Sequence, residues 1–200
     1  MVVGVLALQG DVVEHVMALQ RAGADVVEVR TPADLAQVDA LVVPGGESTT
    51  VIRLAERFGL SGPIKARVRE GMPFWGTCMG MIVAAHDVAD LPQQTLDLLD
   101  VTVRRNAFGR QVDSTEIDLT IPVLGGAPFP AVFIRAPWIE RTGPGVDTLA
   151  ERDGHGVMVR QKNVLGTSFH PELTGDDRIH AYFLQMVRER PPRVEGAATI

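Results

Sequence analysis

The sequence has almost no cysteine, because Cys78 is the only one among 200 residues. A single thiol cannot form an internal disulfide, so we expect a chain that works in the reducing cytoplasm. Aromatic residues are also scarce at 5%, and charged residues reach only 22%, yet apolar residues make up 46% of the chain. This apolar content indicates a folded core rather than a disordered chain.

Positive charge is in short supply as well. The 19 Lys and Arg residues are outnumbered by 25 Asp and Glu residues, which gives a formal net charge of −6. We therefore expect no nucleic-acid partner, since binding to a polyanion requires a basic surface.

Long apolar runs are missing too. No stretch approaches the ~20 apolar residues that cross a bilayer, and no basic region precedes the first apolar segment, residues 2–8. The sequence thus predicts no membrane partner and no signal peptide, as expected of a soluble cytoplasmic protein.

The first half of the chain alternates between apolar strands and amphipathic helices. Strands are expected at residues 2–8, 25–29 and 39–43, with helices after the first strand and after Pro44. This alternation is typical of an α/β doubly wound sheet. The second half instead contains short strands between Gly/Pro-rich turns, at residues 101–103, 114–121, 131–136, 146–152, 156–160 and 164–169.

These patterns predict one α/β domain, a three-layer sandwich around a mixed, mostly parallel central sheet. The short second-half strands account for the mixed character, and a helix at residues 176–188 closes the domain. We expect residues 1–188 to form this single domain, because a chain of 200 residues suits one core. Residues 189–200 contain Pro191 and Pro192 and are expected to be a disordered tail.

The lone cysteine lies in the segment Gly76–Gly80, which reads Gly-Thr-Cys-Met-Gly between an apolar strand and a helix. This is the form of a nucleophile elbow with sulfur in place of oxygen. The two glycines have a steric reason, because a sharp strand-to-helix turn brings neighbouring backbone too close for a Cβ atom. The alternative is that Cys78 is only a small buried apolar residue between loop glycines.

A second motif, Ser168–Glu172, follows an apolar strand and reads Ser-Phe-His-Pro-Glu. Pro171 restricts the residue before it, so His170 is expected to be extended at or just past the strand end. Side chains two residues apart in extended backbone point to one side, so Glu172 could orient one ring nitrogen and leave the other for a thiol. The alternative is a loop histidine beside a solvated carboxylate.

Together with the Pro-Gly-Gly-Glu-Ser loop at Pro44–Ser48, these motifs resemble a class I (triad-type) glutamine amidotransferase. Finer motifs resemble one branch of that class, the glutaminase subunit of pyridoxal 5'-phosphate synthase. They are Leu8–Gly10, Pro44–Thr50, Arg105–Gln111 and Val132–Pro137. The resemblance covers residues 3–187 and implies a flavodoxin-like α/β fold.

The resemblance implies that the chain hydrolyses L-glutamine to L-glutamate and ammonia through a thioester on Cys78. His170 would be the base and Glu172 would orient it. Backbone N–H groups of Gly46 and Met79 would form the oxyanion hole. Met79 departs from the family pattern, which more often has a small residue after the nucleophile.

Further roles follow from the same resemblance. Substrate contacts are expected from Gly46, Glu47, Ser48, Arg105, Ile134 and Arg135, with Gln9 supporting the glycine loop from behind. The ammonia would pass to a (β/α)8-barrel synthase subunit in a heteromeric complex, and this chain would bind no cofactor. The remaining histidines lack metal-ligand spacing, so we interpret them as structural or surface residues and predict no metal site; they are His15, His86, His155 and His180.

The two adjacent glycines of the loop also suggest a switch. A peptide between Gly45 and Gly46 meets little steric resistance to rotation, so the Gly46 N–H need not point at the oxyanion until a partner fixes it. We therefore expect the isolated chain to be a poor glutaminase that its synthase partner activates.

Other functions remain open at this point. The chain could be the glutaminase subunit of another amidotransferase, or a cysteine peptidase on the same fold, although a peptidase needs an open cleft for extended peptide. A non-enzymatic binding domain would usually have lost Cys78, His170 or Glu172, and all three are present.

Overall fold

A computed structural model describes residues 1–89, 92–105 and 114–189. Ten strands of this part form one sheet, and two further strands form a hairpin. The strands are β1 (Val2–Leu6), β2 (Asp25–Val29), β3 (Ala40–Val43), β4 (Phe74–Thr77), β5 (Ala85–Val88), β6 (Leu99–Arg104), β7 (Thr115–Leu119), β8 (Phe129–Phe133), β9 (Trp138–Thr142), β10 (Asp147–Arg152), β11 (His155–Gln161) and β12 (Val164–Thr167).

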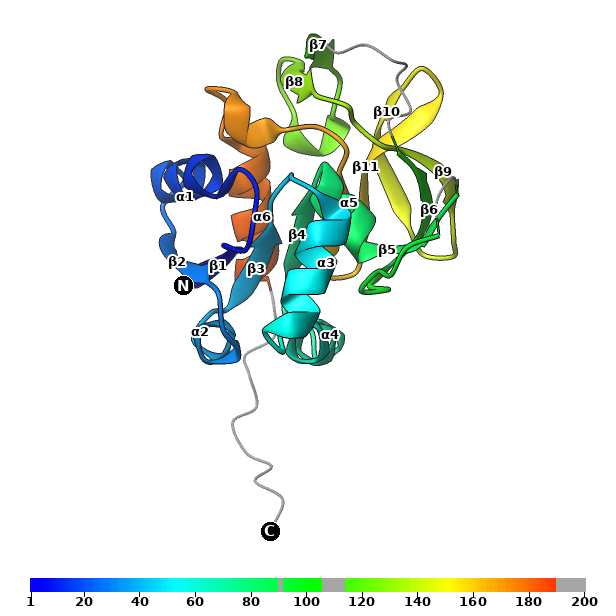
Figure 1. Cartoon of the computed structure of the whole chain (residues 1–200). Coiled ribbons are helices and arrows are strands. Elements are labelled where there is room, and N and C mark those ends of the chain that lie inside the picture. The colour runs from blue at the N-terminus through cyan, green and yellow to red at the C-terminus, as the bar shows by residue number, and fades with distance from the viewer. Residues whose placement is uncertain (90–91, 106–113, 190–200) are drawn as a thin grey trace.

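The order of strands in the large sheet is β2-β1-β3-β4-β12-β11-β9-β6-β5, with β10 paired to β11. Figure 1 labels each of these strands except β12. The first five strands in this order are parallel to one another, and β11 then pairs antiparallel with β12. The hairpin consists of β7 and β8. The prediction of a mixed, mostly parallel α/β sheet is therefore confirmed.

Helices cover both faces of the sheet, which gives the three layers (Figure 1). They are α1 (Val12–Arg21), α2 (Pro32–Ala36), α3 (Ser48–Arg57), α4 (Ser61–Arg69), α5 (Met79–Ala84) and α6 (Arg178–Arg188), with short 3₁₀ turns η1 (Pro122–Leu124) and η2 (Pro171–Leu173). Strand β3 shows why two cores form. Leu41 and Val43 pack with α2 to α5, whereas Ala40 and Val42 pack with α1 and α6, because successive strand side chains point to opposite faces.

The parallel arrangement brings distant motifs to one edge of the sheet. Strands β1, β3, β4 and β12 are neighbours and run in the same direction, so their carboxyl ends lie side by side. Within three residues after these ends come Gln9, Gly45, Cys78 and His170, respectively. Open α/β sheets bind ligands outside this edge.

Several elements differ from the sequence prediction. The segment between the predicted strands at residues 25–29 and 39–43, for which no helix was predicted, contains α2, whose first turn is closed by a capping box between Thr31 and Asp34. Strands β5 and β9 were not predicted, because neither shows a clear apolar pattern. Strand β9 pairs antiparallel with β6, and across this pair Arg104 Nη2 lies 2.8 Å from Glu140 Oε1.

Some expectations fall outside the described residues. The motif Arg105–Gln111 is described only at Arg105, and the predicted tail is described only at Glu189. The domain boundary after residue 188 stays a prediction. Among the helices that the structure describes, none is long and apolar enough to span a membrane.

Two buried histidines join α1 and α6 next to the sheet. His15 Nδ1 lies 3.3 Å from His180 Nε2, and both rings pack edge-on against Trp75. Burial lowers the pKa of both rings, and the pKa of His180 falls to about 4. Both histidines are therefore neutral in the folded protein at neutral pH.

Acid should destabilise this fold through His180. The unfolded chain takes up a proton below its pKa of about 6.5, whereas the folded chain resists until about pH 4. This contribution to stability is thus complete above pH ~6.5 and falls by up to about 1.4 kcal/mol per pH unit below it. Urea unfolding of the wild type and of His180→Leu near neutral and near pH ~5 measures the difference. Equal pH slopes in the two proteins would contradict this assignment.

Candidate active site

Cys78 lies at a sharp turn between β4 and α5. Its backbone has φ +49° and ψ −110°, a left-handed conformation that residues other than glycine seldom adopt. A Cβ added to Gly76 would overlap the Gly80 carbonyl, and one added to Gly80 would overlap the Val43 carbonyl. The steric reason predicted for the two glycines therefore holds, and the turn has the geometry of a nucleophile elbow.

The thiol of Cys78 faces a cavity of about 340 Å³. The side chain is largely buried, and its Sγ lies 3.8 Å from the carbonyl oxygen of Ile134. The cavity is lined by residues that follow the four strand ends and by residues that follow β6 and β8, namely Gln9, Gly10, Asp11, Gly46, Glu47, Cys78, Met79, Arg105, Ile134, Arg135 and His170. This volume is in the range of small-molecule sites.

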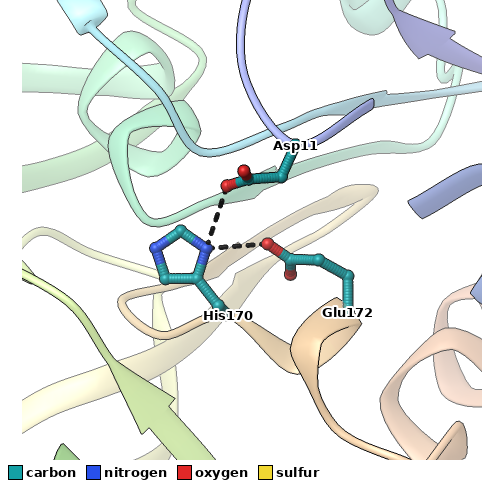
Figure 2. Close-up of side chains that lie close together, drawn as sticks. All are labelled: Asp11, His170 and Glu172. Carbon is teal, nitrogen blue, oxygen red and sulfur yellow. Dashed lines mark hydrogen bonds and ion pairs between the residues drawn. The ribbon is translucent and has the colours of Figure 1, made fainter. Parts of the chain in front are cut away.

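His170 and Glu172 form the contact that the motif predicts. Nδ1 of His170 lies 2.7 Å from Oε1 of Glu172 (Figure 2). The local conformation is different, however, because Glu172 belongs to the 3₁₀ turn η2 rather than to an extended segment. Pro171 starts this turn, and the turn still places both side chains on one side. With Nδ1 engaged by the carboxylate, Nε2 remains for Cys78.

Asp11 supplies a second carboxylate that sequence reasoning missed. Its Oδ2 lies 3.4 Å from the same Nδ1 of His170 (Figure 2). Burial acts to lower the pKa of His170, but its contacts with Asp11, Cys78 and Glu172 outweigh burial and raise this pKa well above the ordinary value. The site therefore favours an imidazolium, which suits a histidine that holds the proton of a neighbouring thiol.

The same three side chains meet the spacing of a metal site. Among the described residues, one ligand atom from each of Asp11, His170 and Glu172 lies within 4.8 Å of the others. The histidine atom is Nδ1, which both carboxylates already contact, so the cluster is explained by the histidine and its acids. The absence of a metal stays a prediction.

The loop after β3 is held by hydrogen bonds from three directions. Glu47 N–H donates to Gln9 Oε1 at 2.6 Å, so the Gln9 side chain contacts the loop, while Gln9 also lines the cavity. Gly45 N–H donates to Thr77 Oγ1 at 3.1 Å, and the Gly45 carbonyl accepts from Asp11 N–H at 3.3 Å. A Cβ on Gly45 would lie 2.5 Å from His170 Cε1, so the loop also packs against the histidine ring.

Most of the predicted substrate residues line the cavity. Arg135 lines the cavity and has a left-handed backbone, with φ +44°. Arg105 also lines it, and its Nη2 lies 3.7 Å from Glu47 Oε1. Ser48 does not line it, because its buried hydroxyl donates to Gln93 Oε1 at 3.0 Å. The cavity thus presents two guanidinium groups together with the carboxylates of Asp11 and Glu47.

Two further polar residues lie behind the predicted triad of Cys78, His170 and Glu172. They were not predicted to belong to the site. His15 Nε2 lies 3.2 Å from Glu172 Oε2 and 3.0 Å from Thr77 Oγ1, and both His15 and Thr77 are fully buried. His15 lies on α1, far from the triad in sequence, so no local pattern could connect them. His86 and His155 instead lie away from the cavity, against Asp97 and Trp138 respectively.

The sequence matches a family profile described as the SNO glutamine amidotransferase family over residues 5–189. It is 56% identical over 189 residues to the pyridoxal 5'-phosphate synthase subunit PdxT of Streptomyces avermitilis, covering 94% of each protein. It is 58% identical over 192 residues to the protein of the same name from Acidothermus cellulolyticus, covering 92% of this chain and 93% of that one.

Solved structures give the same picture of the fold. A crystal structure described as a glutamine amidotransferase has a TM-score of 0.89 and 49% identity, covering 94% of this chain and 100% of that chain. The structure of PurLQS from Thermotoga maritima has a TM-score of 0.65 at 17% identity, with coverage of 94% and 96%. The second likeness shows the fold alone.

The elbow geometry predicts a reversal of the usual helix rule. Alanine in a helix interior normally stabilises a helix by about 1 kcal/mol over glycine. Gly62→Ala in the first turn of α4 is the control: no residue beyond its chain neighbours lies near the added Cβ, but Pro63 follows and disfavours helical backbone for alanine, so we expect little net change in stability. Gly80→Ala in α5 should instead destabilise the protein by roughly 2 kcal/mol, because its Cβ meets the backbone of Val43. Urea unfolding of both variants checks this, and a Gly80→Ala variant as stable as the wild type would contradict the elbow geometry.

Proposed function

The chain belongs to the SNO glutamine amidotransferase family, and from this premise we propose that it hydrolyses L-glutamine through a thioester on Cys78. The observation that carries the proposal is the meeting of one thiol and one carboxylate-bound imidazole at a cavity. The products are L-glutamate and ammonia.

The first half of the reaction forms the thioester. The Cys78 thiolate attacks the side-chain amide carbon of glutamine while His170 holds the thiol proton. The tetrahedral oxyanion accepts hydrogen bonds from the backbone N–H groups of Gly46 and Met79, each worth ~3–4 kcal/mol in related hydrolases. The intermediate collapses when His170 gives its proton to the departing nitrogen, which leaves as ammonia.

The second half releases glutamate. Water that has lost a proton to His170 attacks the glutamyl thioester, and the same oxyanion donors stabilise the second tetrahedral intermediate. Collapse of this intermediate breaks the carbon–sulfur bond and releases the Cys78 thiolate beside the protonated His170, which restores the starting state. Glu172 keeps Nδ1 protonated throughout, so that Nε2 always faces the reacting atoms.

The charges of the cavity support an amino acid as substrate. Glutamine is a zwitterion, with a carboxylate that Arg105 or Arg135 could bind and an ammonium group that Glu47 could bind. Ile134 would contribute its backbone carbonyl near the sulfur, and Ser48 would act through its backbone. A cysteine peptidase is less well supported, since about 340 Å³ suits one small ligand rather than an extended peptide.

The ammonia is proposed to pass to a partner rather than to solvent. Curated relatives at 56% and 58% identity are named pyridoxal 5'-phosphate synthase subunits. The word subunit in these names supports a heteromeric complex that makes pyridoxal 5'-phosphate. In our proposal the subunit that uses the ammonia is the (β/α)8-barrel synthase that the sequence resemblance implies. The names of the relatives favour this assignment over the glutaminase subunit of another amidotransferase. This chain would bind no cofactor and would work in the cytoplasm, where a free thiol stays reduced.

We also propose that the partner completes the oxyanion hole. The Gly45 carbonyl is held by Asp11 N–H, and because a trans peptide is planar, the Gly46 N–H points the opposite way. Rotation of this peptide would redirect the N–H, and docking of the synthase subunit would have to favour one orientation by differential contacts. Gln9, which binds the next N–H in the chain, is the residue through which docking could act.

Replacing the nucleophile tests the proposed function. Cys78→Ala, assayed in complex with the synthase subunit, should lose glutamine hydrolysis by at least ~10³-fold, as nucleophile removal does in related hydrolases. Synthesis driven by added ammonium salt should persist, which controls for folding and docking. Residual hydrolysis near the wild-type rate would refute the role of Cys78.

A second experiment distinguishes the role of the base, His170, from that of the acid that orients it, Glu172. His170→Asn should cost about as much in kcat as losing the nucleophile, because the triad acts as a unit. Glu172→Gln should cost less, since the amide still contacts Nδ1 although it carries no charge. Steady-state assays of both variants in the complex compare the two losses. A larger loss in Glu172→Gln would mean that the two roles are wrongly assigned.

A further inference from the structure

The triad carboxylate has one oxygen that His170 does not use. Both oxygens of Glu172 are buried, and Oε1 takes the bond from His170. Within the described residues Oε2 makes no hydrogen bond of regular geometry, yet His15 Nε2 lies only 3.2 Å away. A buried carboxylate oxygen needs a donor, because water cannot reach it. His15 is placed to provide one.

The neighbours of His15 decide which ring nitrogen carries its proton. The ring is fully buried and its pKa is lowered by burial and by His180 and His170, so it is neutral with a single N–H. His180 Nε2 lies 3.3 Å from His15 Nδ1 and can donate to it. This leaves the His15 proton on Nε2, the ring nitrogen that lies 3.0 Å from Thr77 Oγ1 and 3.2 Å from Glu172 Oε2, so one N–H is shared between these two acceptors. The opposite assignment would set a ring lone pair against a carboxylate.

Thr77 connects the same histidine to the glycine loop. Its Oγ1 lies 3.0 Å from His15 Nε2 and accepts from Gly45 N–H at 3.1 Å. Thr77 also immediately precedes the nucleophile. One imidazole on α1 therefore contacts the acid of the triad and the residue that joins the elbow to the loop.

We propose that His15 is a positioning residue, whose Nε2–H holds the Glu172 carboxylate against His170 and, through Thr77, fixes the Gly45 end of the loop. It does not line the cavity, so it acts only through these neighbours. This inference rests on the proposed function, because it assigns His15 to the same triad. It gives a chemical role to a histidine that would otherwise count as core packing.

Alkylation of Cys78 by iodoacetamide tests the role without relying on glutamine turnover. The reagent is a small carboxamide that fits the cavity, and its rate at fixed pH reports how well His170 holds the thiol proton. His15→Asn should slow alkylation roughly 10-fold, by analogy with the lower end of what loss of the hydrogen-bond partner of a metal-ligating side chain costs. The amide of asparagine reaches only the Nδ1 position. His15→Gln should keep most of the rate, because its amide N–H reaches the Nε2 position.

A double-mutant cycle with Glu172→Gln separates positioning from packing. If His15 acts through the carboxylate, His15→Asn should cost little once that carboxylate is gone, so the two losses should not add. In complex with the synthase subunit, His15→Asn should lower kcat for glutamine with little change in KM. Unfolding free energies of each variant show that it remains folded.

Each outcome decides something. Equal alkylation rates in His15→Asn, His15→Gln and wild type would overturn the proposal, and so would fully additive losses in the cycle. If the wild-type complex failed to hydrolyse glutamine, the proposed function would fall, while the alkylation series would still decide whether His15 positions Glu172.

Discussion

The site depends on one close backbone approach, where the start of α5 meets the end of β3. Gly80 touches the Val43 carbonyl so tightly that no Cβ fits between them. This contact lets α5 begin immediately after β4, and it holds Cys78 in a left-handed conformation at the turn. The same contact brings the nucleophile beside the loop that follows β3. A looser junction would separate the thiol from the Gly46 N–H that the proposed mechanism needs.

Close to this junction the fold places two carboxylates against the ring of His170. Two carboxylates face Nδ1 of His170 from different elements, Asp11 before α1 and Glu172 in η2. Burial alone would keep the histidine neutral, yet these contacts and Cys78 raise its pKa. Burial also lowers the pKa of His15, on the other side of Glu172, and there it prevails. His15 therefore stays neutral and can serve as a hydrogen-bond donor. The imidazoles of His15 and His170, which contact different oxygens of Glu172, thus take different protonation states because their surroundings differ.

The sequence alone predicted the parts of the site that local chemistry dictates. The two glycines around Cys78 indicated an elbow, and the His-Pro-Glu motif indicated a contact between His170 and Glu172. The prediction of an extended backbone at that contact was wrong, because Pro171 starts a 3₁₀ turn. Asp11 and His15 were missed, since each acquires its role only when α1 packs near η2. No spacing in the sequence reports that packing.

In the proposed reaction Cys78 forms a covalent acyl intermediate with the side chain of glutamine. The most direct test treats the complex with a glutamine analogue that carries an electrophilic carbon at the amide position, and then locates the adduct by peptide mass spectrometry. We expect one adduct, on the peptide that contains Cys78, which excess glutamine suppresses and His170→Asn greatly slows. Ammonia release from glutamine by a complex in which Cys78 remains unmodified by the analogue would contradict it.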